Sequence, residues 1–300
     1  MPDSVLTGGV PSILEFRPVQ KTVFAERAGR LRDLARGHAM EEYLQFACAL
    51  ARAQAAELER FPDAPVPAPA RLKHCQQHGL PPLSIENPAQ GAWQRGLLRL
   101  LEALNQEALP PQAARIVAAL RDEDAAALEG DAANVLMGAY AEIDPGRAPF
   151  IGAALQLYWA KMALKLGNDG RSAKVDFRLC PVCGSPPVVS LVRIRGAAQG
   201  LRFLVCSLCA SEWHLVRVKC SSCASTKSIS YLFVEGANDA VKAECCDDCK
   251  TYLKILYLEK DQGIEPIADD LSTLALDLLV DEQGYHRLGP NLLLAPGVET

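Results

Sequence analysis

Cysteine is the residue type whose number and spacing predict chemistry most clearly in this chain of 300 residues. The chain contains 11 cysteines, and nine of them fall between residues 180 and 249. Eight of the nine form pairs with two intervening residues: Cys180/Cys183, Cys206/Cys209, Cys220/Cys223 and Cys246/Cys249. Such a pair on a tight turn can place both sulfurs about 2.3 Å from one ion, and two pairs complete a tetrahedron. The pattern therefore predicts metal binding.

The cysteine pairs repeat along the chain. Twenty-two residues separate Cys183 from Cys206, and 22 separate Cys223 from Cys246, so a shift of 40 residues maps the first set onto the second. A fixed period indicates two copies of one supersecondary unit. We therefore assign Cys180, Cys183, Cys206 and Cys209 to one site and Cys220, Cys223, Cys246 and Cys249 to another. The alternative, in which the two inner pairs share an ion, disregards this symmetry.

The residues themselves leave the identity of the metal open, because zinc and iron both accept four thiolates in a tetrahedron. The first pair, followed by Gly184, is similar to a rubredoxin knuckle, in which glycine permits a turn that directs amide N–H groups towards sulfur. The other three pairs lack this glycine. Closed sites of four cysteines are usually structural, and a redox or partner-sensing role is the alternative. Nearby basic residues could balance the thiolate charge: Arg193, Arg195, Arg202, Arg217 and Lys219.

The three remaining cysteines are interpreted as ordinary thiols. Cys48 lies on a predicted helical face and is expected to be a small buried residue. Cys75 lies near His74 and His78, but no fourth metal ligand is evident there. Cys245 adjoins Cys246 and is expected to be a bystander, although a shift of register by one residue could make it a competing ligand.

The predicted secondary structure changes from helices to strands near residue 170, and the paired cysteines lie in turns between the strands. Residues 21 to 170 are rich in Ala and Leu and predict helices, including helices near 91–108, 112–129, 131–141 and 148–166. Beyond this point, β-branched runs predict strands at 188–194, 201–205, 213–218, 229–234 and 252–258. Residues 267–280 predict a further helix with Leu271, Leu274 and Leu278 on one face.

We therefore expect an α+β protein: an N-terminal all-α domain, two tandem rubredoxin-like or zinc-ribbon metal-binding β units, and a C-terminal helix. The expected boundaries are an irregular lead-in at 1–25, a helical domain at 26–170, a first four-Cys ribbon at 171–218, a second at 219–262, and a C-terminal helix and tail at 263–300. Each ribbon is too small to fold on an apolar core alone, so metal ligation is expected to supply its stability.

Composition and charge restrict the functional classes. The formal net charge of −5 disfavours a generally basic nucleic-acid binder. The first 16 residues do not resemble a signal peptide, and the apolar run from Phe150 to Leu166 is interrupted by Gln156 and Lys161, which favours a buried helix over a membrane span. Dense cysteine pairs in one part of a long chain favour metal binding in a reducing compartment. We therefore expect a cytoplasmic protein without membrane insertion.

With these residues in view, the chain resembles the formate dehydrogenase accessory protein FdhE family over nearly everything after residue 25. The stretches that carry the resemblance are RLRDLARGHAMEEYLQFACALARAQ (30–54), APFIGAALQLYWAKMA (148–163), LCPVCGSPPV (179–188), GLRFLVCSLCASEWHLVRVKC (200–220), KAECCDDCKTYLKILYLEKD (242–261) and ADDLSTLALDLLVDEQGY (268–285). The four cysteine pairs alone are less specific than this combination. Where the family more usually has a small residue other than cysteine, this chain has Cys245.

The resemblance implies a cytoplasmic maturation factor that is not an enzyme and that contacts the catalytic subunit of respiratory formate dehydrogenase. It also implies two metal ions, iron of the rubredoxin type in preference to zinc, held by the eight paired cysteines. A homodimer is possible, and nucleic acid is not an expected partner. Two alternatives are kept: a zinc-ribbon nucleic-acid-binding protein that uses the basic residues near the cysteines, and a thiol-transfer enzyme that uses a loosely held Cys-x-x-Cys pair.

Overall fold

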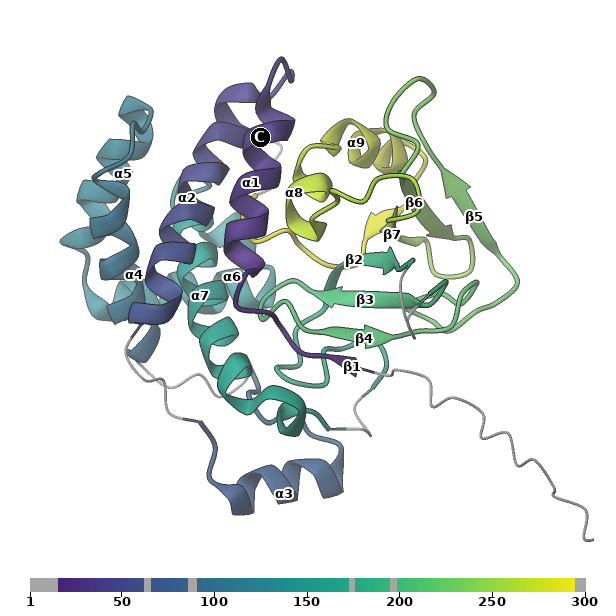
Figure 1. Cartoon of the computed structure of the whole chain (residues 1–300), viewed down its shortest axis with the longest axis horizontal. Helices are drawn as coiled ribbons and strands as arrows, with labels where there is room; N and C mark the ends of the chain where they lie inside the picture. The colour runs from purple at the N-terminus through teal and green to yellow at the C-terminus, as the bar shows by residue number, and fades with distance from the viewer. Residues whose placement is uncertain (1–15, 62–65, 86–90, 173–175, 195–198, 295–300) are drawn as a thin grey trace, which may run out of the picture.

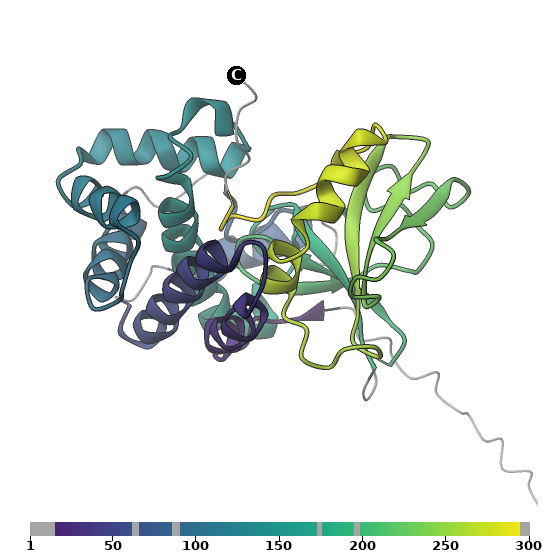
Figure 2. The same cartoon turned by 90° about the horizontal axis from the view of Figure 1, so that it is seen from above.

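The computed structural model describes residues 16–61, 66–85, 91–172, 176–194 and 199–294. Helices form the first half of the chain, and a sheet with two short C-terminal helices forms the second half (Figure 1). Figure 2 shows the two halves side by side. This arrangement confirms the predicted α+β class. The order of elements in the first half is α1 (Val23–Ala35), α2 (Glu41–Arg60), α3 (Pro69–His78), α4 (Ala92–Leu104), α5 (Pro111–Arg121), α6 (Ala125–Met137), η1 (Tyr140–Glu142), α7 (Ala148–Leu166) and η2 (Gly167–Gly170).

Helix α7 is the central element of the helical half. It is buried along nearly its whole length, as the apolar run from Phe150 to Leu166 predicts. Gly152 is required in this helix because a Cβ atom there would lie 2.2 Å from the carbonyl oxygen of Leu292. The predicted helix at 112–129 is two helices, since α5 ends at Arg121 and the carboxylate of Asp124 caps α6 by accepting hydrogen bonds from the amides of Ala126 and Ala127.

The second half is built on one mixed sheet, whose outermost strand, β1, comes from the segment before α1. Its strands are β1 (Phe16–Arg17), β2 (Pro187–Val192), β3 (Arg202–Cys206), β4 (Glu212–His214), β5 (Ile229–Leu232), β6 (Val241–Cys246), β7 (Thr251–Tyr257) and β8 (His286–Arg287), with α8 (Pro266–Leu271) and α9 (Leu274–Glu282) between β7 and β8. The strand order is β1-β4-β3-β2-β7-β6-β5, and β8 pairs with β7. The two cysteine units are therefore fused through the parallel pairing of β2 with β7.

The second half differs from the sequence expectations in two places. Strand β6 has no counterpart among the predicted strands, although its Val241, Ala243 and Cys245 alternate with Lys242 and Glu244 in the period-two pattern of a strand. The predicted helix at 267–280 is interrupted, since α8 ends at Leu271 and α9 begins at Leu274. This break turns the second helix, so that Leu276 and Val280 are buried while Leu278 is exposed.

Buried polar contacts join the helical half to the sheet. The guanidinium of Arg27 on α1 donates to Glu265, which precedes α8, at 3.1 Å and to Gln156 on α7 at 3.2 Å. The Gln156 side-chain amide donates to the carbonyl of Ser207 at 2.8 Å. Ser207 lies between Cys206 and Cys209, so this contact ties the central helix directly to one of the cysteine turns.

Candidate metal centres

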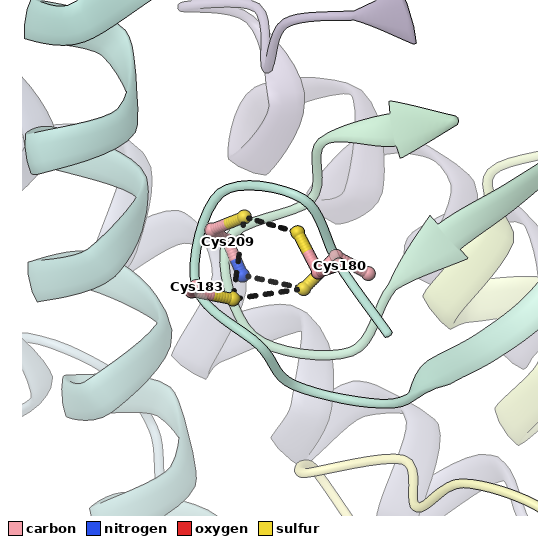
Figure 3. A group of neighbouring side chains, drawn as sticks. Cys180, Cys183 and Cys209 are labelled. Atoms are coloured by element: carbon pink, nitrogen blue, oxygen red, sulfur yellow. Dashed lines mark hydrogen bonds between the residues drawn. The ribbon is translucent and has the colours of Figure 1, made fainter. Parts of the chain in front are cut away.

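The first predicted set of cysteines converges on one point. The sulfur of Cys180 lies 3.6 Å from that of Cys209, and the sulfur of Cys183 lies 3.4 Å from Cys206 and 3.7 Å from Cys209. Figure 3 shows the side chains of Cys180, Cys183 and Cys209 pointing towards one another from two neighbouring turns. Four sulfurs about 2.3 Å from a common ion would be separated by about 3.8 Å in a tetrahedron. The four thiols, all buried, therefore fit a tetrahedral metal ion.

The second predicted set forms a matching group. The sulfur of Cys220 lies 3.6 Å from Cys249, and that of Cys223 lies 3.7 Å from Cys246. In each group the four sulfurs lie within 4.8 Å of one another. The structure thus pairs the cysteines within each 40-residue unit, and the alternative pairing of the two inner turns is wrong. Within the described part of the chain, these are the two groups of cysteine, histidine or carboxylate side chains that could hold a metal ion.

All four cysteine turns share one backbone conformation. The residue after the second cysteine has a positive φ in each: 80° at Gly184, 58° at Ala210, 66° at Ala224 and 54° at Lys250. Glycine alone adopts this left-handed conformation without steric cost, so the sequence signals the conformation only at Gly184. The other three turns form in spite of the unfavourable residue, which indicates that their geometry is imposed by the sulfur arrangement and the surrounding sheet.

The turns direct backbone N–H groups at sulfur, as in rubredoxin-like knuckles. The amides of Leu208 and Cys209 point at the sulfur of Cys206, at 3.4 and 3.3 Å, and those of Ser222 and Cys223 point at the sulfur of Cys220, at 3.3 and 3.4 Å. Hydrogen bonds to sulfur stabilise the negative thiolate, which is the form that binds metal.

Two hydroxyl groups complete the sulfur environment and were missed in the sequence. The Ser211 hydroxyl lies 3.3 Å from the sulfur of Cys209, and the Thr251 hydroxyl lies 3.0 Å from the sulfur of Cys249. Ser211 and Thr251 are themselves 40 residues apart, so the repeat that relates the cysteines also relates these hydroxyls. The 40-residue repeat could therefore have predicted both hydroxyls as part of the sulfur environment.

The thiols divide into groups of contrasting acidity. Burial raises the pKa values of Cys180 and Cys183 well above the usual range. Burial also opposes ionisation of Cys249, but hydrogen bonds from Thr251 and from the thiols of Cys220 and Cys223 prevail and lower its pKa to about 6. Cys209 is likewise buried, but its hydrogen bonds with the other three thiols and with the Ser211 hydroxyl lower its pKa. A tetrahedral ion would replace these shared protons with a positive charge, so metal binding is expected to release protons.

The helical half seals the first group. The amides of Leu83 and Ile85 donate to the carbonyls of Val182 and Cys183, at 2.9 and 3.1 Å, and thereby lay this segment along the first turn. The indole of Trp159 on α7 donates to the carbonyl of Leu83 at 2.9 Å and holds the segment in place. The second group lacks such a cover over Cys223, which is exposed. The first group is therefore embedded in the core, whereas the second combines buried Cys220 and Cys246 with exposed Cys223 and partly exposed Cys249.

The remaining thiols lie outside both groups. Cys245 is buried on β6 opposite Tyr252, whereas its neighbour Cys246 belongs to the second group, because successive side chains of a strand point to opposite faces. Burial and the carboxylates of Asp247 and Glu244 raise the pKa of Cys245 to about 12. Cys48 and Cys75 are also buried, on α2 and α3.

The basic residues near the cysteines are mostly engaged by protein groups. Arg193 forms an ion pair with Glu212. The fully buried Arg202 lies 2.7 Å from a carboxylate oxygen of Glu244, and the ammonium of Lys219 lies 4.4 Å from the centre of the Phe177 ring. Arg217 is exposed, and Arg195 lies outside the described residues. The structure therefore uses two of the arginines to join strands rather than to present positive charge to a ligand.

The fold and these two groups define a protein with paired cysteine knuckles on a fused sheet, attached to a helical half. Comparison with known families identifies the chain further: models described as FdhE N-terminal, FdhE central domain and FdhE C-terminal domain match residues 13–175, 179–217 and 218–294. The chain belongs to the FdhE family.

Individual relatives agree with this assignment. Protein FdhE homolog of Stutzerimonas stutzeri is 44% identical over 283 residues, which cover 93% of this chain and 92% of that protein. Protein FdhE of Escherichia coli K12 is 42% identical over 282 residues, covering 93% and 90%. The crystal structure of FdhE from Pseudomonas aeruginosa superposes with a TM-score of 0.85 at 39% identity and covers 94% of this chain and 99% of that one. Among the described residues, no helix has the length and apolar character needed to cross a membrane.

Proposed function

We propose that this protein is a cytoplasmic maturation factor for respiratory formate dehydrogenase. It binds the catalytic subunit of that enzyme before export and acts by binding rather than by catalysis. Its eight paired cysteines hold two metal ions, iron of the rubredoxin type in preference to zinc. Membership of the FdhE family along nearly the whole chain is the observation that carries this proposal, because all three family models match in order.

The two sulfur groups support the metal part of the proposal. Each supplies four thiols at spacings that suit a tetrahedral ion. The amides directed at Cys206 and Cys220 are the kind of hydrogen bond through which a protein sets the properties of thiolate-bound iron. When bound, each ion supplies a rigid cross-link between two turns. The residues of the chain then fix the position of β3 relative to β2 in the first unit and of β6 relative to β5 in the second.

Two observations weigh against the alternatives. Phosphate binding needs free positive charge, but Arg193 and Arg202 are paired with Glu212 and Glu244. Thiol transfer needs an accessible thiolate that is free of metal, but the four sulfurs of the first group are buried. This objection applies to the first group only, because Cys223 in the second group is exposed.

The function is tested by deleting the gene from a host that makes respiratory formate dehydrogenase. Formate oxidation should be lost while other molybdenum enzymes stay active, and the intact gene should restore it. Affinity-tagged protein should also retain the catalytic subunit. Normal formate oxidation in the deletion strain, or loss of every molybdenum enzyme together, would overturn the proposal.

A matched pair of variants separates the metal sites from the rest of the molecule. Cys180→Ser removes a predicted ligand, whereas Cys245→Ser alters a buried thiol outside both groups. We expect the first variant to restore formate oxidation poorly and the second to restore most of it.

A further inference from the structure

A cavity of about 650 Å³ lies between helix α1 and the sheet. Its walls come from α1, from strands β2, β3 and β4, and from the connection between β7 and α8; Figure 1 shows α1 and α8 side by side next to this part of the sheet. Val205 and Ala210, which flank the turn from Cys206 to Cys209, also line it. Cavities of this volume commonly bind small organic molecules. This one is therefore a candidate ligand site beside the first sulfur group.

One end of the cavity carries an excess of positive charge. The guanidinium of Arg193 donates to both carboxylate oxygens of Glu212, to one of them at 2.9 Å. Arg17, which pairs with Glu212 across strands β1 and β4, places its Nε 3.5 Å from the same carboxylate. Both arginines also line a second, smaller cavity of about 250 Å³. Two guanidiniums therefore share one carboxylate, which leaves one positive charge in excess within this cluster.

The unused binding capacity of the cluster belongs to Arg17. Its Nε is buried, yet it has no hydrogen-bond acceptor among the described residues. A buried donor without an acceptor is destabilising. Burial and the positive charge of Arg193 lower the pKa of Arg17, although Glu212 opposes this shift. A bound anion would supply an acceptor to Arg17 and offset the repulsion between the two guanidiniums.

The rest of the cavity offers apolar surface and no comparable cation. Buried apolar side chains contribute to its walls: Val19, Leu191, Val205, Ile264 and Ile267. Arg27 and Arg30 on α1 also line the cavity, but carboxylates neutralise each of them in ion pairs. Glu26 and Asp33 of the same helix are exposed to water. An occupant would therefore meet an apolar wall next to one cationic end.

Gly29 leaves room in the wall that α1 forms. It lies inside this helix, where glycine is less favourable than alanine. A Cβ atom at this position would meet no atom of another described segment within 4 Å, so packing within the protein does not require a glycine. Because Gly29 lines the cavity, a larger side chain here could extend into it. Space kept for a ligand explains the glycine.

We propose that this cavity binds a small organic anion that carries one carboxylate on an apolar chain. The carboxylate binds Arg17, and the chain lies along the apolar wall past Gly29. One negative charge balances the single excess positive charge of the cluster, whereas a phosphate dianion would exceed it. This site is separate from both sulfur groups, and the proposal does not depend on the proposed function.

Isothermal titration calorimetry of the full metal-loaded chain with sodium octanoate, at low salt, tests the proposal. Octanoate should bind wild type at one saturable site with a dissociation constant of about 1 mM or lower. Three further probes each lack one part of the proposed ligand: 1-octanol lacks the charge, and acetate and inorganic phosphate lack the chain. Each of them should bind about tenfold more weakly than octanoate, or more weakly still.

Variants locate the site. Arg17→Gln should raise the dissociation constant for octanoate about tenfold, whereas Glu212→Gln removes the competing carboxylate and should lower it about threefold. Gly29→Leu should raise the constant about tenfold or more by filling the cavity. Two matched controls should have no effect: Arg60→Gln changes an exposed arginine of α2, and Gly130→Leu changes an exposed glycine of α6 that also has open space around its Cβ position.

Circular dichroism and metal content should match those of wild type in every variant. Absence of saturable octanoate binding up to about 10 mM would overturn the proposal. Equal affinity for octanoate and 1-octanol would overturn recognition of the carboxylate, and equal affinity for octanoate and acetate would overturn the role of the chain. Unchanged octanoate affinity in folded Arg17→Gln and Gly29→Leu would place the bound octanoate outside this cavity and overturn the site.

Discussion

The buried ion pair between Arg202 and Glu244 should make stability depend on pH in a specific way once one partner is removed. The Arg202 side chain is fully buried and lies 2.7 Å from the Glu244 carboxylate, which also accepts a hydrogen bond from the Tyr231 hydroxyl at 3.1 Å. The pair joins β3 of the first cysteine unit to β6 of the second. Arg202→Met would leave the carboxylate buried without its cation, which should lower the free energy of unfolding by about 3–5 kcal/mol at pH 7.

The sign of the pH dependence follows from the carboxylate. Burial already raises the pKa of Glu244, although Arg202 and Tyr231 oppose that shift. Removing Arg202 raises the folded-state pKa further above its unfolded value. The folded variant then binds a proton that the unfolded chain has lost, so its stability falls as pH rises towards the folded pKa. Relative to wild type, the variant should lose up to about 1.4 kcal/mol per pH unit between the folded-state pKa of Glu244 in wild type and its higher folded-state pKa in the variant.

Urea denaturation of the metal-loaded proteins at several pH values measures this effect. The double variant Arg202→Met/Glu244→Gln removes the charge while keeping an acceptor for Tyr231, so it should recover more than half of the lost stability and abolish the extra pH dependence. A destabilisation that does not change with pH, or a double variant no more stable than Arg202→Met, would refute the role assigned to the unpaired carboxylate.

Three further predictions concern the cysteine turns. Cys180→Ser should lower metal content from two ions per chain to one and reduce thermal stability, as measured by elemental analysis and calorimetry; unchanged values would contradict ligation. Cys245→Ala should keep both ions whereas Cys246→Ala loses one, and the opposite result would shift the ligand register. Ala224→Gly should raise the free energy of unfolding by about 1 kcal/mol, because glycine adopts a positive φ without strain, and Gly184→Ala should lower it by at least as much. If both changes shifted the free energy of unfolding in the same direction, the shared positive φ would not explain the stability of these turns.

The grouping of the eight cysteines could be predicted because spacing alone fixes it. The 22-residue gaps and the 40-residue shift allow one symmetric pairing within each unit, and the structure brings together the same sulfurs. The long apolar helix α7 was predictable for a similar reason, because an uninterrupted run of apolar residues indicates a buried helix without reference to distant contacts. Whether the grouped sulfurs bind metal stays a prediction.

Features that depend on distant contacts could not be predicted. The segment from Leu83 to Ile85 covers the first group only because α7 holds it there through Trp159. The left-handed turns at Ala210 and Ala224 oppose local preference, so tertiary geometry must impose them. The Asp269-Asp270 pair resembles simple helix N-terminal charge, yet the two carboxylates are buried and bind Arg30 and Arg287 respectively.

The proposed function depends most directly on two four-thiolate metal ions in each chain. X-ray absorption spectroscopy with elemental analysis, on protein purified without added metal, measures the ligands and the stoichiometry together. We predict two iron ions per chain, each with four sulfur neighbours at about 2.3 Å, and coloured protein in the ferric state. Two zinc ions would contradict the assignment of iron, and fewer than two ions or a shell containing nitrogen or oxygen would contradict the sites themselves.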